Sequence, residues 1–147
     1  MLALHACVVR VSVVRGSSME PALHDGDRLI VDRFGAPDDA LGRGDVVVLA
    51  YPLDPAVDFV KRIVALPGDR VAMQDGVLFV NGIPDACDCF RDAENLPEHE
   101  IPDECYFVLG DNRAVSCDSR TFGTVPKELI RGRVRARVWP LHDALVF

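Results

Sequence analysis

The sequence predicts a single, mostly β domain, in which short strands fold on themselves as a barrel or sandwich with very little helix. Three observations indicate this. Short apolar runs are separated by Gly, Pro and Asp along most of the chain. Residues 130–139 alternate arginine with small or apolar residues, and a period of two requires a strand. Asp75-Gly76 lies between two apolar runs and is typical of a hairpin, because type I′ turns need positive φ.

Each strand is expected where an apolar run falls between turn residues. The expected strands are residues 7–14, 28–33, 45–51, 59–66, 71–73, 77–80, 105–109 and 130–139. In the last of these, period two places four arginines on one face, namely Arg131, Arg133, Arg135 and Arg137. Residues 126–129 suggest a single helical turn.

The net charge of −7 argues against a nucleic-acid partner, because nucleic-acid-binding proteins are usually basic. The charge is concentrated between Asp85 and Glu104, where eight acids stand against one base. That segment sums to −7, and the remaining 15 acids and 15 bases cancel. We interpret residues 83–102 as an acidic insertion or lobe of one domain that spans residues 1–147.

No segment is apolar over the roughly 20 residues that a membrane-spanning helix needs. The five cysteines cannot all pair within the chain, because their number is odd. Cys87, Cys89, Cys105 and His99 match no zinc-ligand spacing. A disulfide within the acidic segment fits better, provided that the domain lies outside the cytosol. The sequence leaves open the redox state of Cys87, Cys89, Cys105 and Cys117.

Ser18 is a candidate nucleophile in a tight turn. Gly16 and Pro21 bend the chain on either side of it, so that its hydroxyl can project from the end of a strand. A serine hydroxyl is a poor nucleophile unless a base lies beside it. Taken alone, such a serine is far more often a structural hydroxyl, and the hypothesis therefore depends on finding the base.

Lys61 is the candidate base. In a strand it shares a face with Phe59, Ile63 and Ala65, and burial there disfavours the charged amine and lowers its pKa. A neutral lysine can act as a general base near neutral pH, whereas the neighbouring Arg62 cannot lose its proton. A serine activated by a lysine would make the chain a hydrolase that needs neither metal nor cofactor. The competing interpretation is a lysine whose ammonium reaches water.

A third segment, residues 110–123, is a loop dense in small polar groups after an apolar strand. In it, Asp118 and Arg120 can pair and brace the loop, and Ser116 can hydrogen-bond a neutral amine. The competing interpretation is a surface turn that bonds only to itself.

Together these segments resemble the conserved boxes of bacterial type I signal peptidases (leader peptidases), a family of Ser-Lys membrane proteases. Residues 18–23 (Ser-Met-Glu-Pro-Ala-Leu) resemble the nucleophile box, and residues 44–48 (Gly-Asp-Val-Val-Val) a second box. Residues 61–69 (Lys-Arg-Ile-Val-Ala-Leu-Pro-Gly-Asp) resemble the lysine box, and residues 110–120 the last box. The boxes occur in the family's order, and the resemblance covers residues 8–139.

The resemblance implies a role for each matching residue. Ser18 would attack the scissile carbonyl and its backbone N–H would bind the oxyanion. Lys61 would take the proton from the serine and return it to the leaving amine. Ser116 would hold the lysine amine in place, and Asp118 and Arg120 would form a supporting ion pair. The implied fold is the signal-peptidase β domain with a small inserted β lobe.

The chain departs from the family pattern at the position of the second oxyanion donor. Some family members carry a serine two positions before the nucleophile, where this chain has Gly16. Ser17, directly before the nucleophile, is a weaker candidate for an oxyanion or orienting role. Because of this departure from the family pattern, the sequence does not identify the second oxyanion donor.

The resemblance also implies partners and a location. Substrates would be preprotein signal peptides, bound in extended form and cut after small residues of the Ala-X-Ala type. The catalytic domain would lie on the extracytoplasmic face of the cytoplasmic membrane. The residues themselves suggest that the arginine face of residues 130–139 and Trp139 meet anionic lipid headgroups, and the competing interpretation is a solvated strand face. Family members usually carry an anchor before the nucleophile box, and we expect one upstream of Met1 or another means of attachment. Two alternatives stay open: a soluble Ser-Lys protease that trims one propeptide, and a non-catalytic β domain.

Overall fold

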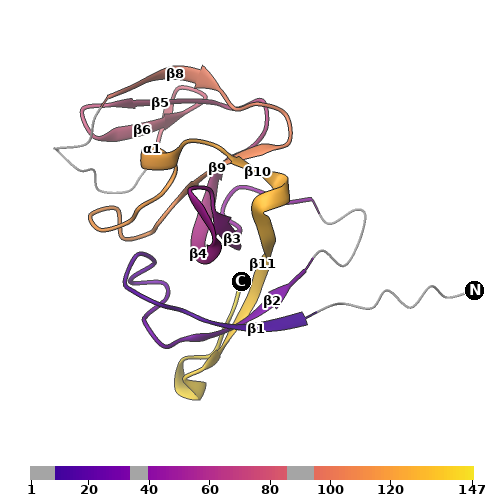
Figure 1. Ribbon diagram of the computed structural model, residues 1–147. Coiled ribbons are helices and arrows are strands. Elements are labelled where there is room, and N and C mark those ends of the chain that lie inside the picture. The colour runs from indigo at the N-terminus through magenta and orange to yellow at the C-terminus, as the bar shows by residue number, and fades with distance from the viewer. Residues whose placement is uncertain (1–8, 34–39, 86–94) are drawn as a thin grey trace, which may run out of the picture.

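Two antiparallel sheets make up the protein (Figure 1). The computed structural model describes residues 9–33, 40–85 and 95–147. The larger sheet has the order β1-β2-β11-β3-β4-β9-β10, with β12 paired to β11, and it stays an open path rather than a closed barrel. Its strands are β1 (Val9–Val13), β2 (Arg28–Asp32), β3 (Val46–Tyr51), β4 (Asp54–Ala65), β9 (Cys105–Leu109), β10 (Val125–Pro126), β11 (Ile130–Trp139) and β12 (Leu145–Val146).

The smaller sheet forms a lobe above the larger one in Figure 1, with the order β7-β6-β5-β8. Its strands are β5 (Arg70–Gln74), β6 (Val77–Val80), β7 (Ile83–Pro84) and β8 (Leu96–Glu100). Helix is limited to α1 (Ser119–Phe122) and the 3-10 turns η1 (Lys127–Leu129) and η2 (Leu141–Asp143). The mostly β fold class predicted from the sequence is therefore confirmed.

The strand predictions hold closely where the apolar pattern is clear. Asp75 and Gly76 have φ of 49° and 78° and close the β5–β6 hairpin as the sequence predicted. Strand β4 is longer than predicted, because it begins at Asp54 with five exposed residues that carry no apolar pattern. Strand β8 was missed for the same reason: its residues are mostly polar and exposed. The small sheet begins at Arg70, ahead of the lobe predicted for residues 83–102, of which 86–94 lie outside the described residues.

The predicted arginine face of β11 is wrong at its last member. The strand has register shifts against β2 between Val134 and Ala136 and again between Arg137 and Trp139. Such bulges break the strict two-residue alternation. As a result Arg137 is 7 % exposed and turns inward, whereas the other three arginines stay half-buried.

Three apolar clusters form the core and hold the two sheets together. One is formed by residues of β2, β3 and β11 and includes Met19 and Leu23 from the β1–β2 loop. Strand β9 joins the other two, because alternate residues point to opposite faces. Tyr106 and Val108 pack in the cluster of the large sheet, whereas Phe107 packs against the small sheet.

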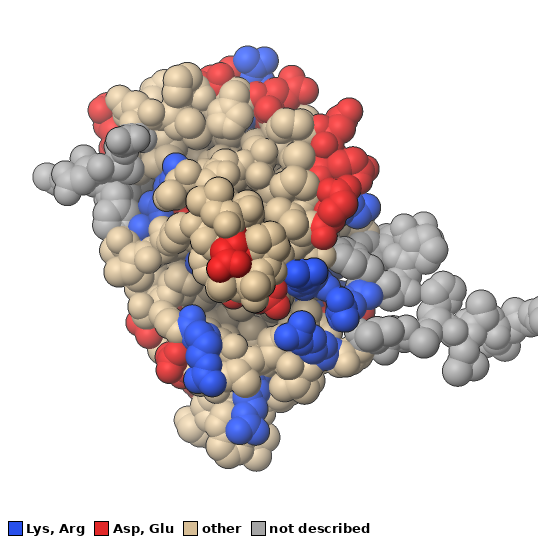
Figure 2. Space-filling view, in the orientation of Figure 1, with Lys and Arg blue, Asp and Glu red and all other residues tan. Residues whose placement is uncertain are grey.

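Charge is divided between the two parts of the molecule. In Figure 2, acidic side chains gather over the upper part, where the small sheet lies, and basic side chains over the lower part, around β1, β2 and β11. Across the described ranges, no helix is long and apolar enough to cross a bilayer.

Candidate active site

The β1–β2 loop holds Ser18 in a turn that is fixed by the burial of neighbouring apolar side chains. Met19 and Leu23 are 1 % and 0 % exposed, and the Leu23 N–H donates to the Met19 carbonyl at 2.9 Å. The loop is closed at its base, where the Val14 N–H donates to the Asp27 carbonyl at 2.8 Å. Burial of the flanking side chains leaves Ser18 half-buried on the outside of the turn, which we call the nucleophile turn (residues 16–23).

Lys61 reaches this turn from β4. Its Nζ lies 2.9 Å from the Ser18 Oγ, and the residue is 3 % exposed. The amine sits 5.1 Å from the centre of the Phe59 ring, an apolar wall that the strand periodicity predicted. Burial lowers the pKa of Lys61 from its ordinary value, although the Asp118 carboxylate works in the opposite direction. Such an environment favours a neutral amine beside the hydroxyl.

The loop after β9 is braced by Asp118, which is fully buried. Its carboxylate accepts the Gly110 N–H at 3.0 Å and two guanidinium hydrogen bonds from Arg120, each at 2.9 Å. Burial alone would raise the pKa of Asp118, but these donors outweigh it and lower the pKa. The pairing of Asp118 with Arg120 that the sequence suggested is therefore present in the structure.

A second set of bonds ties this loop to the nucleophile turn. The Asn112 backbone N–H donates to the Ser18 carbonyl at 2.9 Å, and its side-chain amide donates to the Ser17 carbonyl at 3.1 Å. Sequence reasoning missed Asn112, because a polar residue in a polar loop gives no sign of its partner.

The remaining candidate residues, Ser116 and Ser17, take less part in the hydrogen bonds of the site. Ser116 Oγ is buried but makes no hydrogen bond of ordinary geometry within the described residues, and it lies near Asp118, whose pKa it helps to lower. The Ser17 side chain is exposed. The Gly16 N–H donates to the Asp25 carboxylate at 2.7 Å, with φ of 83°. The roles predicted for Ser116 and Ser17 stay predictions.

Two of the cysteines fall within the described residues. Cys105 and Cys117 are free thiols, whereas Cys87 and Cys89 lie outside the described residues, as does any disulfide between them. Cys117 was not singled out from the sequence, yet it borders the dyad beside Tyr51, whose pKa is raised by partial burial and by this thiol. In the described part of the chain, no group of His, Cys, Asp and Glu side chains could hold a metal ion.

Ser18 and Lys61 open onto a cleft of about 580 Å³, which we call the dyad cleft. Its two walls are the first part of the chain, residues 10–19, and residues 58–61 of β4. Val115 and Cys117 close it from the loop after β9. A serine, a buried amine and a cleft between two strands form the site expected of a peptide hydrolase.

Comparison with known proteins agrees with this geometry. The family model described as "Signal peptidase, peptidase S26" matches residues 1–139. The chain belongs to this family of bacterial type I signal peptidases. Members are serine endopeptidases that remove signal peptides, and they are membrane-associated with an extracytoplasmic catalytic domain.

Individual relatives span most of the chain. Signal peptidase IB of Staphylococcus aureus is 34 % identical over 156 residues, which cover 92 % of this chain and 81 % of that protein. Signal peptidase I of Bacillus caldolyticus is 37 % identical over 147 residues, covering 89 % and 80 %. The crystal structure of a signal peptidase I from Enterococcus faecalis is similar with a TM-score of 0.52 and 29 % identity, covering 65 % of this chain and 97 % of that one.

Proposed function

We propose that this signal peptidase cuts preproteins with a Ser18–Lys61 dyad. The observation that carries the proposal is the 2.9 Å approach of the Lys61 amine to the Ser18 hydroxyl at a nearly solvent-free position. The neutral amine accepts the hydroxyl proton as Ser18 Oγ bonds to the scissile carbonyl carbon. The ammonium then gives that proton to the leaving amine, and the C–N bond breaks to leave an acyl-enzyme.

The same amine completes the cycle. Lys61, neutral again, takes a proton from a water molecule, whose oxygen attacks the ester carbonyl, and Ser18 leaves with the proton restored. The Ser18 N–H donates to the oxyanion in both tetrahedral states, where one such donor contributes about 3 kcal/mol. Asp118 and Arg120 keep the last loop, and through Asn112 the nucleophile turn, in register with β4.

Substrate binding by strand addition is supported by two unpaired strand edges. Strand β1 pairs only with β2 among the described strands, and β4 pairs with β9 only from Arg62 onward. Within the described ranges, the edge of β4 at residues 58–60 therefore lines the dyad cleft without a strand partner. An extended signal peptide inserted between β1 and β4 would satisfy both edges. We propose cleavage after small residues of the Ala-X-Ala type, because the walls bring Val14, Val48 and Val60 close to the dyad.

A lipid surface is the second proposed partner. The arginines of β11 support it less than expected, because Arg137 is buried and Arg135 pairs with Asp32 at 3.1 Å. Support comes instead from apolar side chains exposed at the C-terminal end, namely Trp139, Leu141, Leu145 and Val146. Sedimentation with anionic and with neutral vesicles tests this: Leu141→Asp should weaken vesicle binding, and an unchanged bound fraction would contradict it.

The dyad is tested with a preprotein that carries a signal peptide. Ser18→Ala and Lys61→Ala should each abolish cleavage while circular dichroism stays unchanged, and Lys61→Arg should be inactive because a guanidinium keeps its proton. N-terminal sequencing of the wild-type product should place the cut after a small residue. Cleavage retained by a folded Lys61→Ala variant would refute the proposed mechanism.

A further inference from the structure

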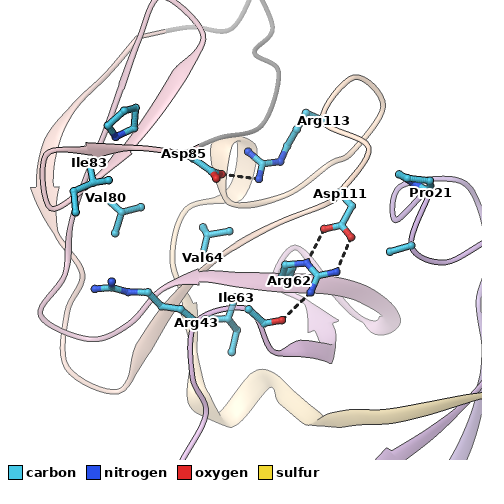
Figure 3. A pocket seen from close by; sticks show the side chains of 13 residues that line it. Pro21, Arg43, Arg62, Ile63, Val64, Val80, Ile83, Asp85, Asp111 and Arg113 are labelled. Atoms are coloured by element: carbon cyan, nitrogen blue, oxygen red, sulfur yellow. Dashed lines mark hydrogen bonds and ion pairs between the residues drawn. The ribbon is translucent and has the colours of Figure 1, made fainter. Parts of the chain in front are cut away.

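A second cleft, of about 680 Å³, lies between β4 and the small sheet (Figure 3). Its volume falls within the range of ordinary ligand sites, about 300–1,000 Å³. Val64 of the large sheet and Val80 and Ile83 of the small sheet give it an apolar lining. Ile83 is 69 % exposed, so the rim of this cleft presents an apolar side chain to solvent.

The second cleft and the dyad cleft meet at the catalytic residues. In three separate segments, residues only one or two positions apart line different clefts. The changes fall between Met19 and Pro21 in the nucleophile turn, between Lys61 and Arg62 in β4, and between Val115 and Arg113 in the loop after β9. The dyad therefore stands at the boundary between two hollows rather than at the closed end of one.

For a peptide that adds to β1 and β4 in parallel, the direction of these strands says which end of it reaches the second cleft. Strands β1 and β4 are separated in the sheet by β2, β11 and β3, and each neighbouring pair is antiparallel. These four successive antiparallel pairings make β1 and β4 parallel to each other, and both strands run toward the dyad. A peptide lying alongside them in parallel has its cleaved bond at Ser18, and its next residues continue past the nucleophile turn.

We propose that the second cleft binds the first residues of the mature protein, the segment that follows the cleaved bond. The inference rests on the proposed function, because it extends the path of the same substrate. The segment leaves Ser18, bends across Pro21 and lies between β4 and the small sheet. Its extended backbone covers the apolar lining that the free protein leaves open to water.

The charges of the second cleft suit an occupant of varied sequence. Arg62 pairs with Asp111 at 2.7 Å, and Arg113 pairs with Asp85 at 2.8 Å (Figure 3). Each of these guanidinium groups already has a carboxylate partner, so the walls demand no particular charge from the ligand. A cleft with internally paired charges therefore accommodates segments that differ in charge.

Photo-crosslinking tests the proposal on the full chain without cleavage. Ser18→Ala is incubated with a preprotein carrying a benzoylphenylalanine either two residues before the cut, at the X of Ala-X-Ala, or three residues after it, and the crosslinked peptides are mapped by mass spectrometry. The probe before the cut should label β1 or β4 in the dyad cleft, and the probe after it should label residues 80–85 or Arg113. If the first probe labels the dyad cleft and the second labels residues elsewhere, the inference fails while the proposed function stands. If neither probe labels the protein near the dyad, the proposed function fails as well.

A matched pair of variants gives a second, kinetic test. Two substrates are compared, one ending two residues after the cut and one extending eight residues beyond it. Ile83→Asp places a carboxylate in the apolar mouth and should lower the ratio of kcat/KM, long substrate over short, at least threefold. Leu53→Asp, an equally exposed position outside both clefts, should leave the ratio unchanged. An unchanged ratio in Ile83→Asp would overturn the inference.

Discussion

Arg137 and Asp27 form a buried ion pair that joins the last long strand to the β1–β2 loop. Their nitrogen and oxygen atoms lie 3.1 Å apart, and both side chains are more than nine-tenths buried. The same guanidinium donates to the Ala22 carbonyl at 3.0 Å and to the Asp143 carbonyl at 2.8 Å. Through the bond to Ala22, strand β11 also supports the nucleophile turn.

Breaking this pair should strongly destabilise the fold. Arg137→Met leaves the Asp27 carboxylate buried without its partner, and such a loss typically costs about 3–5 kcal/mol. The free energy of unfolding in urea measures the effect. Arg70→Gln serves as the control, because its pair with Glu98 is more than half exposed and should contribute under about 1 kcal/mol. If the two variants lost equal amounts of unfolding free energy, burial would not be what makes the Arg137–Asp27 pair the more stabilising one.

The pH profile should report the protonation state of Lys61. Activity requires the neutral amine, so kcat/KM should rise with pH through the pKa of Lys61, which burial sets below the ordinary 10.5. The Asp118 carboxylate favours the charged amine and raises that pKa. Asp118→Asn should therefore move the rising limb to lower pH, while the maximal rate falls about tenfold or more because the loop loses its brace.

An exposed acid far from the dyad provides the control for this profile. Glu98→Gln, in the small sheet, should leave the rising limb where it stands in the wild type. A limb that moves to higher pH in Asp118→Asn would mean that another group controls the rate.

Sequence reasoning reached the dyad because its signals are local. The apolar neighbours of Lys61 predicted its burial, and the small residues beside Ser18 predicted a turn. It failed at Arg137, because a bulge depends on how β11 pairs with β2, and strict alternation gives no warning of it. It also failed for Asn112 and Asp27, whose partners come from distant segments that only the fold brings together.

The burial of Lys61 should lower the free energy of unfolding at neutral pH. The unfolded chain keeps a proton on this lysine up to about 10.4, whereas the folded chain releases it at lower pH. Between the two pKa values the unfolded state binds more protons, so the free energy of unfolding rises with pH in that window. Lys61→Met, which keeps the volume without the charge, should be more stable than the wild type at pH 7, by roughly 1–2 kcal/mol.

Thermal unfolding at pH 7 and pH 10 measures this difference. It should narrow at the higher pH, because the unfolded chain then no longer fully binds the proton that the folded chain has released. A variant that is less stable at pH 7, or a difference that widens with pH, would show that Lys61 is held as a charged group.

Gly110 should be essential for the position of the nucleophile. A Cβ at residue 110 would overlap the Ser116 side chain and lie 2.6 Å from the Ser18 carbonyl oxygen, which Asn112 holds in place. Gly110→Ala must therefore displace the nucleophile turn or the loop after β9, and a shift of about 1 Å can cost about 100-fold in rate. We expect kcat to fall by that order in a protein that remains folded.

Gly132 offers a matched control, because a Cβ there would lie 2.5 Å from the Asp32 carbonyl oxygen, between β11 and β2. Gly132→Ala crowds backbone as severely but acts on the sheet rather than on the nucleophile. It should lower the midpoint of thermal unfolding, while the folded fraction retains a kcat close to that of the wild type. If both variants lost kcat equally, crowding at residue 110 would act through general destabilisation, and the close contact of Gly110 with Ser18 would not be what sets the rate.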